Sequence, residues 1–181
     1  STLFPYTTLF RSKHIEMQKD FEAYSENSSF NTLEINPGRH DIAVITTGLG
    51  GNYYRENLPD FAPAPSHLHI GVYPVPVEKV RRLCGSADRI VIIEEGYPFV
   101  ERLVRGILPQ NKIINGKMDN VVSPAGELDP DNVRAALGLS PLNAQPPVAV
   151  KLPGRPPQLC AGCPHKDSFK ALNEAVEKLG G

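Results

Sequence analysis

Short apolar runs alternate with segments of helical periodicity through the middle of the chain. The runs are rich in β-branched residues, which pack well on the pleated surface of a sheet. Uninterrupted apolar runs of this length are typical of strands that are buried on both faces. The predicted strands are residues 42–47, 67–73, 89–95 and 112–114.

Between and after these runs, apolar residues recur every three or four positions, which places them on one face of a helix. Three of these segments have proline near their start and the last has glycine after its end, as helix termini commonly do. Strands that alternate with helices at this spacing predict an α/β fold, with a parallel sheet that has helices on both faces. The predicted helices are residues 52–58, 76–84, 98–107 and 129–137.

The beginning of the chain has a different character. Residues 1–12 read STLFPYTTLFRS, which looks like the conceptual translation of a common sequencing adaptor. We expect them to be an artefact fused to a truncated reading frame; the alternative is an ordinary β-prone strand, because Thr, Phe, Tyr and Leu favour strands. Residues 13–24 have a polar helical pattern, and residues 25–36 are predicted to be a turn-rich connector.

The end of the chain differs again. Seven prolines fall within residues 141–164, a density that favours an extended, semi-rigid linker over helix or sheet. Residues 165–179 then return to a helical pattern with a clear apolar face. A single helix cannot bury such a face alone, so we expect it to belong to a second domain. The face consists of Phe169, Leu172, Val176 and Leu179.

Composition excludes several classes of protein. Lysine and arginine total 19 against 20 aspartates and glutamates, which gives no electrostatic reason to bind nucleic acid or an anionic membrane. No stretch approaches the roughly 20 apolar residues of a transmembrane helix. The expected location is the cytoplasm. Three cysteines cannot close a disulfide framework, which argues against a small secreted scaffold.

Cys160 and Cys163 form the most informative motif, in the string LCAGCPH. Two thiols separated by two residues can bind one metal atom or one corner of an iron–sulfur cluster, and a following helix N-terminus favours thiolate. Haem attachment requires histidine directly after the second cysteine, but Pro164 is there. A structural zinc ribbon requires a second cysteine pair, and only Cys84 remains. A thioredoxin-type dithiol should follow a strand, whereas this pair follows the proline-rich segment. An incomplete cluster site with further ligands elsewhere fits best, and a chance pair is the alternative.

Two other motifs follow predicted strands. The glycines of residues 48–51 could cradle a phosphate, but the dinucleotide fingerprint lacks its third glycine, so a tight turn with close helix–sheet packing is the preferred interpretation. Glu94 and Glu95 end the third strand, at the edge where α/β sheets bind ligands. Adjacent strand residues point to opposite faces, so a solvated or helix-capping role is favoured over catalysis.

Histidines and the third cysteine complete the candidates. His67 and His69 alternate along a predicted strand and share a face, which could seat a metal ion, although no third ligand is identifiable. Cys84 lies on the apolar face of a predicted helix and is interpreted as a core residue.

Five strings occur in an order that resembles the alpha subunits of indolepyruvate:ferredoxin oxidoreductases, which are thiamine-diphosphate-dependent 2-oxoacid:ferredoxin oxidoreductases. The resemblance covers nearly everything after residue 12, and five ordered motifs are far more specific than any one of them. The strings are IAVITTGLGGNYYREN, YPVPVEKVRRL, ADRIVIIEEGYPFVE, GELDPDNVRAAL and RPPQLCAGCPH.

The resemblance implies a domain order. Residues 13–36 would be the tail of a pyrimidine-binding domain with its connector, and residues 37–139 a complete transketolase-C-terminal-like α/β domain. Residues 140–158 would be the proline-rich linker. Residues 159–181 would be only the beginning of the thiamine-diphosphate-binding domain.

The resemblance also implies the chemistry of a parent enzyme that oxidatively decarboxylates aryl 2-oxoacids to acyl-CoA. Its cofactors would be thiamine diphosphate with Mg²⁺ and iron–sulfur clusters, and its partners a beta subunit, ferredoxin, coenzyme A and arylpyruvates. Cys160 and Cys163 match the family's Cys-x-Gly-Cys-Pro-His motif as cluster or cofactor-proximal residues, and Gly162 and His165 are candidates for the thiamine site. Catalytic residues would lie outside this chain, which alone should be inactive.

A different function class stays open. The chain could be a non-catalytic α/β interaction domain that carries a CxxC thiol or metal clip. Further cysteine clusters and a metal–diphosphate motif downstream would favour the enzyme, and their absence would favour the clip.

Overall fold

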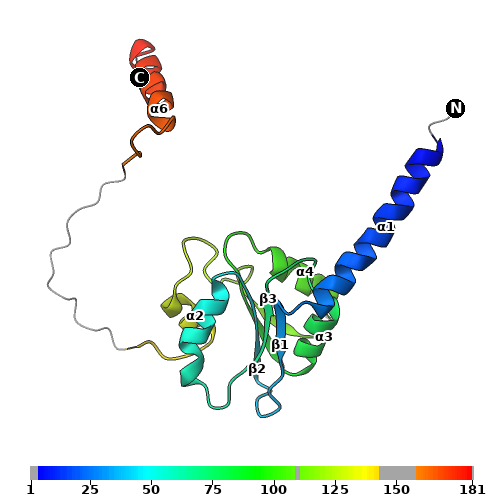
Figure 1. Ribbon diagram of the computed structural model, residues 1–181. Helices are drawn as coiled ribbons and strands as arrows, with labels where there is room; N and C mark the ends of the chain where they lie inside the picture. The colour runs from blue at the N-terminus through cyan, green and yellow to red at the C-terminus, as the bar shows by residue number, and fades with distance from the viewer. Residues whose placement is uncertain (1–3, 109–110, 143–157, 181) are drawn as a thin grey trace. The chain divides into compact units, whose positions relative to one another are not determined.

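The computed structural model describes residues 4–108, 111–142 and 158–180, and the side chains of residues 4–9 are outside this description. The chain divides into two compact units, residues 1–143 and residues 144–181 (Figure 1). None of the described helices combines the length and the apolar character that crossing a membrane requires.

The first unit is built on a five-stranded sheet, and its parallel strands come from the middle of the chain. The strand order is β1-β3-β2-β4-β5, and β2, β3, β4 and β5 pair in parallel. The α/β fold predicted from the apolar runs is therefore confirmed. The strands are β1 (Asn31–Glu34), β2 (Ile42–Thr47), β3 (Ser66–Ile70), β4 (Arg89–Ile93) and β5 (Ile113–Asn115).

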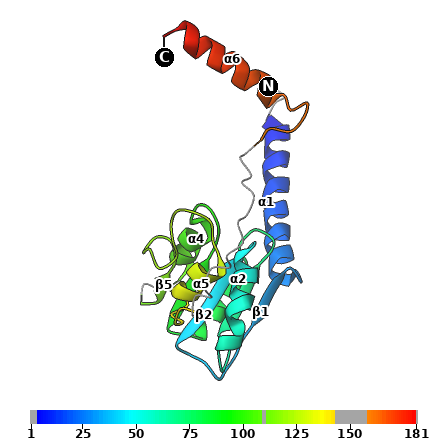
Figure 2. The same ribbon diagram turned by 90° about the vertical axis from the view of Figure 1, so that its left-hand side faces the viewer.

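Helices cover both faces of this sheet, as predicted. Figure 1 shows α2 on one side and α3 and α4 on the other, and Figure 2 looks onto the α2 side with α5 beside α2. The helices α2, α3, α4 and α5 each follow a strand, which is the arrangement that parallel neighbours require. The helices of this unit are α1 (Phe4–Asn27), α2 (Gly50–Asn57), α3 (Val77–Gly85), α4 (Phe99–Ile107) and α5 (Pro130–Ala136), with a 3₁₀ turn η1 (Leu58–Asp60) after α2.

Two apolar cores form because alternate residues of the central strands point to opposite faces. From β2, Ala43 and Ile45 face the α3 and α4 side, whereas Ile42 and Val44 face the α2 and α5 side. All four are at most 1% exposed. The unbroken apolar run at 42–47 is therefore explained by burial on both faces, as the sequence pattern indicated.

Residues 25–36 correct one prediction. The sequence predicts a turn-rich connector here, but these residues contain β1, an edge strand antiparallel to β3. Asn31 anchors it, because its side-chain amide donates to the Ser25 carbonyl and its side-chain oxygen accepts from the backbone N–H groups of Gly71 and Val72. The strand NTLE has one apolar side chain, so its place in the sheet comes from contacts with distant residues.

The helix at the beginning of the chain is also longer than predicted. The pattern indicated a helix over residues 13–24, and α1 includes it but starts at Phe4. The β-prone alternative for residues 1–12 is therefore wrong from Phe4 onward. The adaptor origin of these residues stays a prediction.

The second unit contains the described residues 158–180 and has one helix, α6 (His165–Lys178), as predicted from its periodicity. Nearly all of its residues are exposed, including the apolar face of α6. Most of the predicted linker at 140–158 lies outside the described residues.

Candidate functional site

The glycine turn after β2 is shaped by close packing. A Cβ atom on Gly50 would lie 2.7 Å from the Ile93 carbonyl oxygen, and one on Gly51 would lie 2.9 Å from the ring of His69. Gly48 has φ +50°, a conformation that favours glycine. Gly50 and Gly51 let α2 approach β4 and β3, and Gly48 allows the turn itself, which confirms the interpretation as a tight turn with close helix–sheet packing.

Glu94 caps the following helix. Its carboxylate accepts from the backbone N–H groups of Val100 and Glu101, both at 2.9 Å, and so satisfies two donors in the first turn of α4. Burial raises the pKa of Glu94, and the hydrogen bonds from the two N–H groups oppose that rise. The helix-capping role expected at this position is confirmed for Glu94, whereas Glu95 is exposed.

A cleft lies at the carboxyl edge of the sheet, between the loops that follow β2 and β4. Because β2 is flanked by β3 on one side and by β4 on the other, this is the point where the strand order reverses, which is where open α/β sheets bind ligands. The cleft has a volume of about 410 Å³ and contains two carboxylates. It is lined by Leu49, Tyr53, Glu95, Gly96, Gly126, Glu127 and Leu128.

The two histidines on β3 are brought together by a residue that sequence reasoning missed. The Thr46 hydroxyl lies 2.9 Å from His67 Nε2 and 2.9 Å from His69 Nδ1, and the Tyr54 ring centroid is 4.3 Å from that of His67. Burial, then the charges of His69 and Arg55, lower the pKa of His67 to about 3. The prediction that His67 and His69 share a face is confirmed. Their hydrogen bonds with Thr46 join the two uncharged rings in one network.

A second buried network fixes the loop after β5. Glu101 is fully buried on α4 and accepts from the backbone N–H of Lys117 at 2.7 Å and from the Arg105 guanidinium at 2.7 Å. The Lys117 ammonium donates to the Gly96 carbonyl at 2.8 Å, at the rim of the cleft. Glu101 and Lys117 were not singled out from the sequence, because their hydrogen bond joins two segments that carry no recognisable motif.

Cys160 and Cys163 are brought together by a tight turn. The Cys163 N–H donates to the Cys160 carbonyl at 3.1 Å, and Gly162 between them has φ +75°. These two features define a four-residue turn with a left-handed residue at its third position, which glycine adopts without strain. The glycine of the CxGC motif is therefore explained by backbone geometry.

The turn leads directly into α6. The Cys163 sulfur lies 3.3 Å from His165 Nδ1, and the Cys163 carbonyl accepts from the Lys166 N–H at 3.0 Å. Cys160 is exposed and Cys163 is partly buried. The structure thus places the four predicted site residues, Cys160, Gly162, Cys163 and His165, within one short segment that ends at the start of a helix.

This donor set covers only part of a cluster site. A [4Fe–4S] cluster takes four thiolates, and the turn supplies two. Across residues 4–108, 111–142 and 158–180, no three potential metal ligands come together. Iron–sulfur chemistry at Cys160 and Cys163 therefore requires ligands beyond those described, and the thiamine role of Gly162 and His165 stays a prediction.

The sequence comparisons agree on one kind of protein. The chain is 29% identical over 177 residues to indolepyruvate oxidoreductase subunit IorA of Archaeoglobus fulgidus, covering 92% of this chain and 28% of that protein. It is 26% identical to the subunit of the same name from Methanothermobacter thermautotrophicus and 30% identical to that from Pyrococcus horikoshii, with the same two coverages. These relatives confirm the resemblance drawn from the five ordered strings.

The match is to part of a larger protein. The chain spans about 28% of the length of these curated relatives. No protein-family profile matches the chain, and no solved structure matches it.

Proposed function

We propose that this chain is part of the alpha subunit of an oxidoreductase that oxidatively decarboxylates aryl 2-oxoacids of the indolepyruvate type. The observation that carries the proposal is the match of 92% of the chain to IorA subunits from several organisms. The α/β unit with its buried core and the CxGC turn both fall within that matched length. The parent enzyme would act in the cytoplasm.

The cofactors of the parent enzyme would be thiamine diphosphate with Mg²⁺ and iron–sulfur clusters. When bound, thiamine diphosphate would supply the electron sink that decarboxylation of a 2-oxoacid needs, and the clusters would supply electron transfer. In this proposal, the turn holds Cys160 and Cys163 as two cluster ligands, and Gly162 and His165 line the thiamine site. The 3.1 Å turn hydrogen bond supports the first assignment, because it fixes the two thiol-bearing residues in one short loop.

The partners of the parent enzyme follow from the same proposal. The relatives are named as subunits, which supports a complementary beta subunit. Ferredoxin would accept the electrons, and coenzyme A would accept the acyl group from the arylpyruvate. The α/β unit would contribute structure and spacing between the domains that bind the cofactors.

The direct test uses the complete reading frame that contains this chain, produced together with its beta subunit. We expect reduction of ferredoxin that depends on coenzyme A and on indolepyruvate or phenylpyruvate, with pyruvate and 2-oxoglutarate as poorer substrates. Equal or better turnover of the small 2-oxoacids would contradict the aryl assignment. Failure to reduce ferredoxin with any 2-oxoacid, in protein loaded with thiamine diphosphate and iron, would contradict the oxidoreductase itself.

The isolated 181-residue chain should show no thiamine-dependent decarboxylation, because it spans about 28% of the length of the curated relatives and, in this proposal, the catalytic residues lie outside it. Release of CO₂ from phenylpyruvate by this chain would overturn that part of the proposal. If the complete reading frame lacked further cysteine clusters, the chain would instead be an α/β interaction domain with a two-thiol clip.

A further inference from the structure

The turn that contains the cysteine pair has the backbone geometry that a disulfide bond needs. The hydrogen bond from the Cys163 N–H to the Cys160 carbonyl closes a four-residue turn, in which the first and last Cα atoms lie within about 7 Å of each other. The Cα atoms of a disulfide are usually about 4.4–6.8 Å apart. The two cysteines can therefore be joined with little movement of the backbone.

The turn is also open to small molecules in solution. Cys160 is exposed, and Cys163 is partly buried, with its sulfur 3.3 Å from His165 Nδ1. The other residues of the segment 158–165 are all exposed. A low-molecular-weight oxidant can therefore reach the Cys160 sulfur directly.

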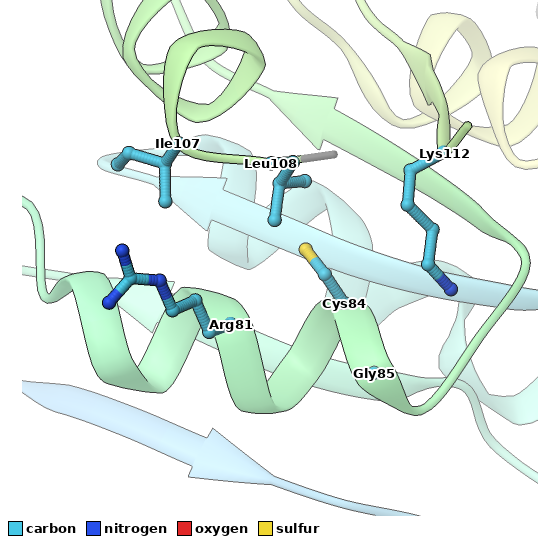
Figure 3. Close-up of a pocket in the computed structure, with 6 residues that line it drawn as sticks. All are labelled: Arg81, Cys84, Gly85, Ile107, Leu108 and Lys112. Carbon is cyan, nitrogen blue, oxygen red and sulfur yellow. The ribbon is translucent and has the colours of Figure 1, made fainter. Parts of the chain in front are cut away.

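The third thiol of the chain has the opposite environment. Cys84 is 2% exposed within the α/β unit, and Figure 3 shows its sulfur directed toward Leu108. Burial raises the pKa of the Cys84 thiol to about 12, although the charge of Lys112 acts in the other direction. A thiol attacks a disulfide as its thiolate, so Cys84 should stay reduced under conditions that oxidise the pair.

We propose that Cys160 and Cys163 form a reversible disulfide, by exchange with low-molecular-weight disulfides of the glutathione class, when the pair holds no metal. The Cys160 thiolate attacks the small disulfide and displaces one thiol, which leaves a mixed disulfide on Cys160. The Cys163 thiolate then attacks the Cys160 sulfur and displaces the second thiol. Overall, two protein thiols are oxidised to one disulfide, one small disulfide is reduced to two thiols, and the two protein thiol protons pass to the leaving thiolates.

This disulfide and a metal bound at the same pair exclude each other. Metals bind cysteine as thiolate, and the disulfide has no thiolate to offer. The pair therefore has a closed form without metal and an open form that can bind one. The proposal goes beyond the oxidoreductase assignment and does not rest on it, because the exchange requires only the turn and its two thiols.

The test is an exchange experiment on the whole 181-residue chain, freed of metal with a chelator and incubated in defined mixtures of glutathione and glutathione disulfide. Free thiols are then alkylated and located by mass spectrometry. We expect a product with Cys160 and Cys163 joined, Cys84 alkylated and no glutathione attached, and dithiothreitol should restore three free thiols. A glutathione adduct that persists on Cys160, a disulfide between two chains, or a pair that stays reduced in glutathione disulfide alone would overturn the proposal.

Cys163→Ser separates the two steps of the exchange. Cys160 should still react, but the mixed disulfide then has no second thiol to resolve it, so the variant should accumulate with glutathione on Cys160. Cys84→Ala is the matched control and should close its disulfide as the wild type does. A Cys163→Ser protein that stays free of glutathione would contradict Cys160 as the first thiol to react.

Cd²⁺ reports whether the closed form and the metal-bound form exclude each other. The oxidised chain should give no Cd²⁺–thiolate absorption band, and reduction with a phosphine should restore the band. A band of full strength from the oxidised chain would contradict the exclusion.

Gly162→Ala tests whether the turn favours the bond. The closed ring keeps residue 162 in the left-handed conformation, with φ +75° in this structure, which alanine adopts at a cost. The equilibrium constant for closure should therefore fall at least about fivefold. Gly180→Ala is the matched control, because Gly180 has a similar φ of +77° but lies beyond the end of α6. Unchanged closure in the Gly162 variant, or an equal fall in both variants, would contradict the turn as the basis of the disulfide.

Discussion

The α/β unit buries its apolar side chains, whereas the segment that contains α6 exposes them. Central strand residues such as Leu68 and Ile45 are fully buried between helices of their own unit. Leu172, on the apolar face of α6, is 58% exposed, and Phe169 on the same face is 54% exposed. The first region carries its own core, whereas the second presents an apolar face and two thiols.

This difference shows where each region gets its stability. Burial of side chains within the sheet and its helices supplies the main favourable free energy of the first region. An isolated helix of 14 residues has little stability in water without tertiary contacts. We therefore expect the cysteine turn and α6 to reach their full order only in the parent protein.

A matched pair of leucine substitutions tests this comparison with the largest expected effect. Leu68→Ala should lower the free energy of unfolding by about 2–5 kcal/mol, because it removes a fully buried side chain and leaves a cavity. Leu172→Ala should change it by less than about 0.5 kcal/mol, since the side chain is already exposed. Urea denaturation of the 181-residue chain measures both. A loss of several kcal/mol in the Leu172 variant would mean that α6 packs on a core.

Acid should destabilise the α/β unit through His67. The pKa of His67 is lowered from 6.5 to about 3 in the folded chain, so below pH 6.5 the unfolded chain binds a proton that the folded chain does not. The free energy of unfolding should therefore fall as the pH is lowered from 6.5 to roughly 4.5. The fall should be about 2 kcal/mol larger in the wild type than in His67→Gln.

His165→Gln is the control from the other region, because His165 is exposed and its replacement should leave the pH dependence unchanged. Comparing variants cancels the contribution of Glu94, whose raised pKa acts in the opposite direction. Identical pH profiles for the wild type and His67→Gln would show that His67 does not carry the effect.

Two glycines in the α/β unit should respond to alanine with opposite signs. A Cβ atom on Gly116 would lie 2.4 Å from the buried Glu101 carboxylate, so Gly116→Ala should cost about 1–3 kcal/mol. Gly106, within α4, has open space at that position, so Gly106→Ala should stabilise by about 0.5–1 kcal/mol. Thermal unfolding of both variants measures the difference, and a Gly116 variant as stable as the wild type would contradict the packing of Glu101.

The smallest expected effect concerns the cysteine turn. Gly162 has φ +75°, so Gly162→Ala should cost about 1 kcal/mol in forming the turn and leave the Tm of the α/β unit unchanged. The thiol pair should then bind Cd²⁺ about fivefold more weakly, as measured by the thiolate absorption band. Gly106→Ala should keep the wild-type affinity. An unchanged affinity in the Gly162 variant would show that the turn does not organise the two thiols.

Much of the fold follows from local pattern. The runs at 42–47 and 89–95 are long, β-branched and apolar, and both become central strands because only burial on two faces suits such a sequence. The capping role of Glu94 was also predictable, because it directly follows a strand and shortly precedes a proline that marks the next helix. The proline after the CxGC motif correctly placed Cys163 next to the start of a helix.

Other features depend on contacts that no local pattern encodes. β1 joins the sheet through the Asn31 side chain, which pairs with residues about 40 positions away. Thr46 joins two histidines from the neighbouring strand, and Glu101 binds a loop 16 residues further along the chain.

The claim that the functional chemistry of this chain lies in the cysteine turn has one direct test. In the complete subunit with its beta subunit, indolepyruvate-dependent reduction of ferredoxin and bound iron are measured for Cys160→Ser/Cys163→Ser and for Cys84→Ala. We expect the double variant to lose iron and activity, and the Cys84 variant to keep both. Full iron and activity in the double variant would contradict the claim.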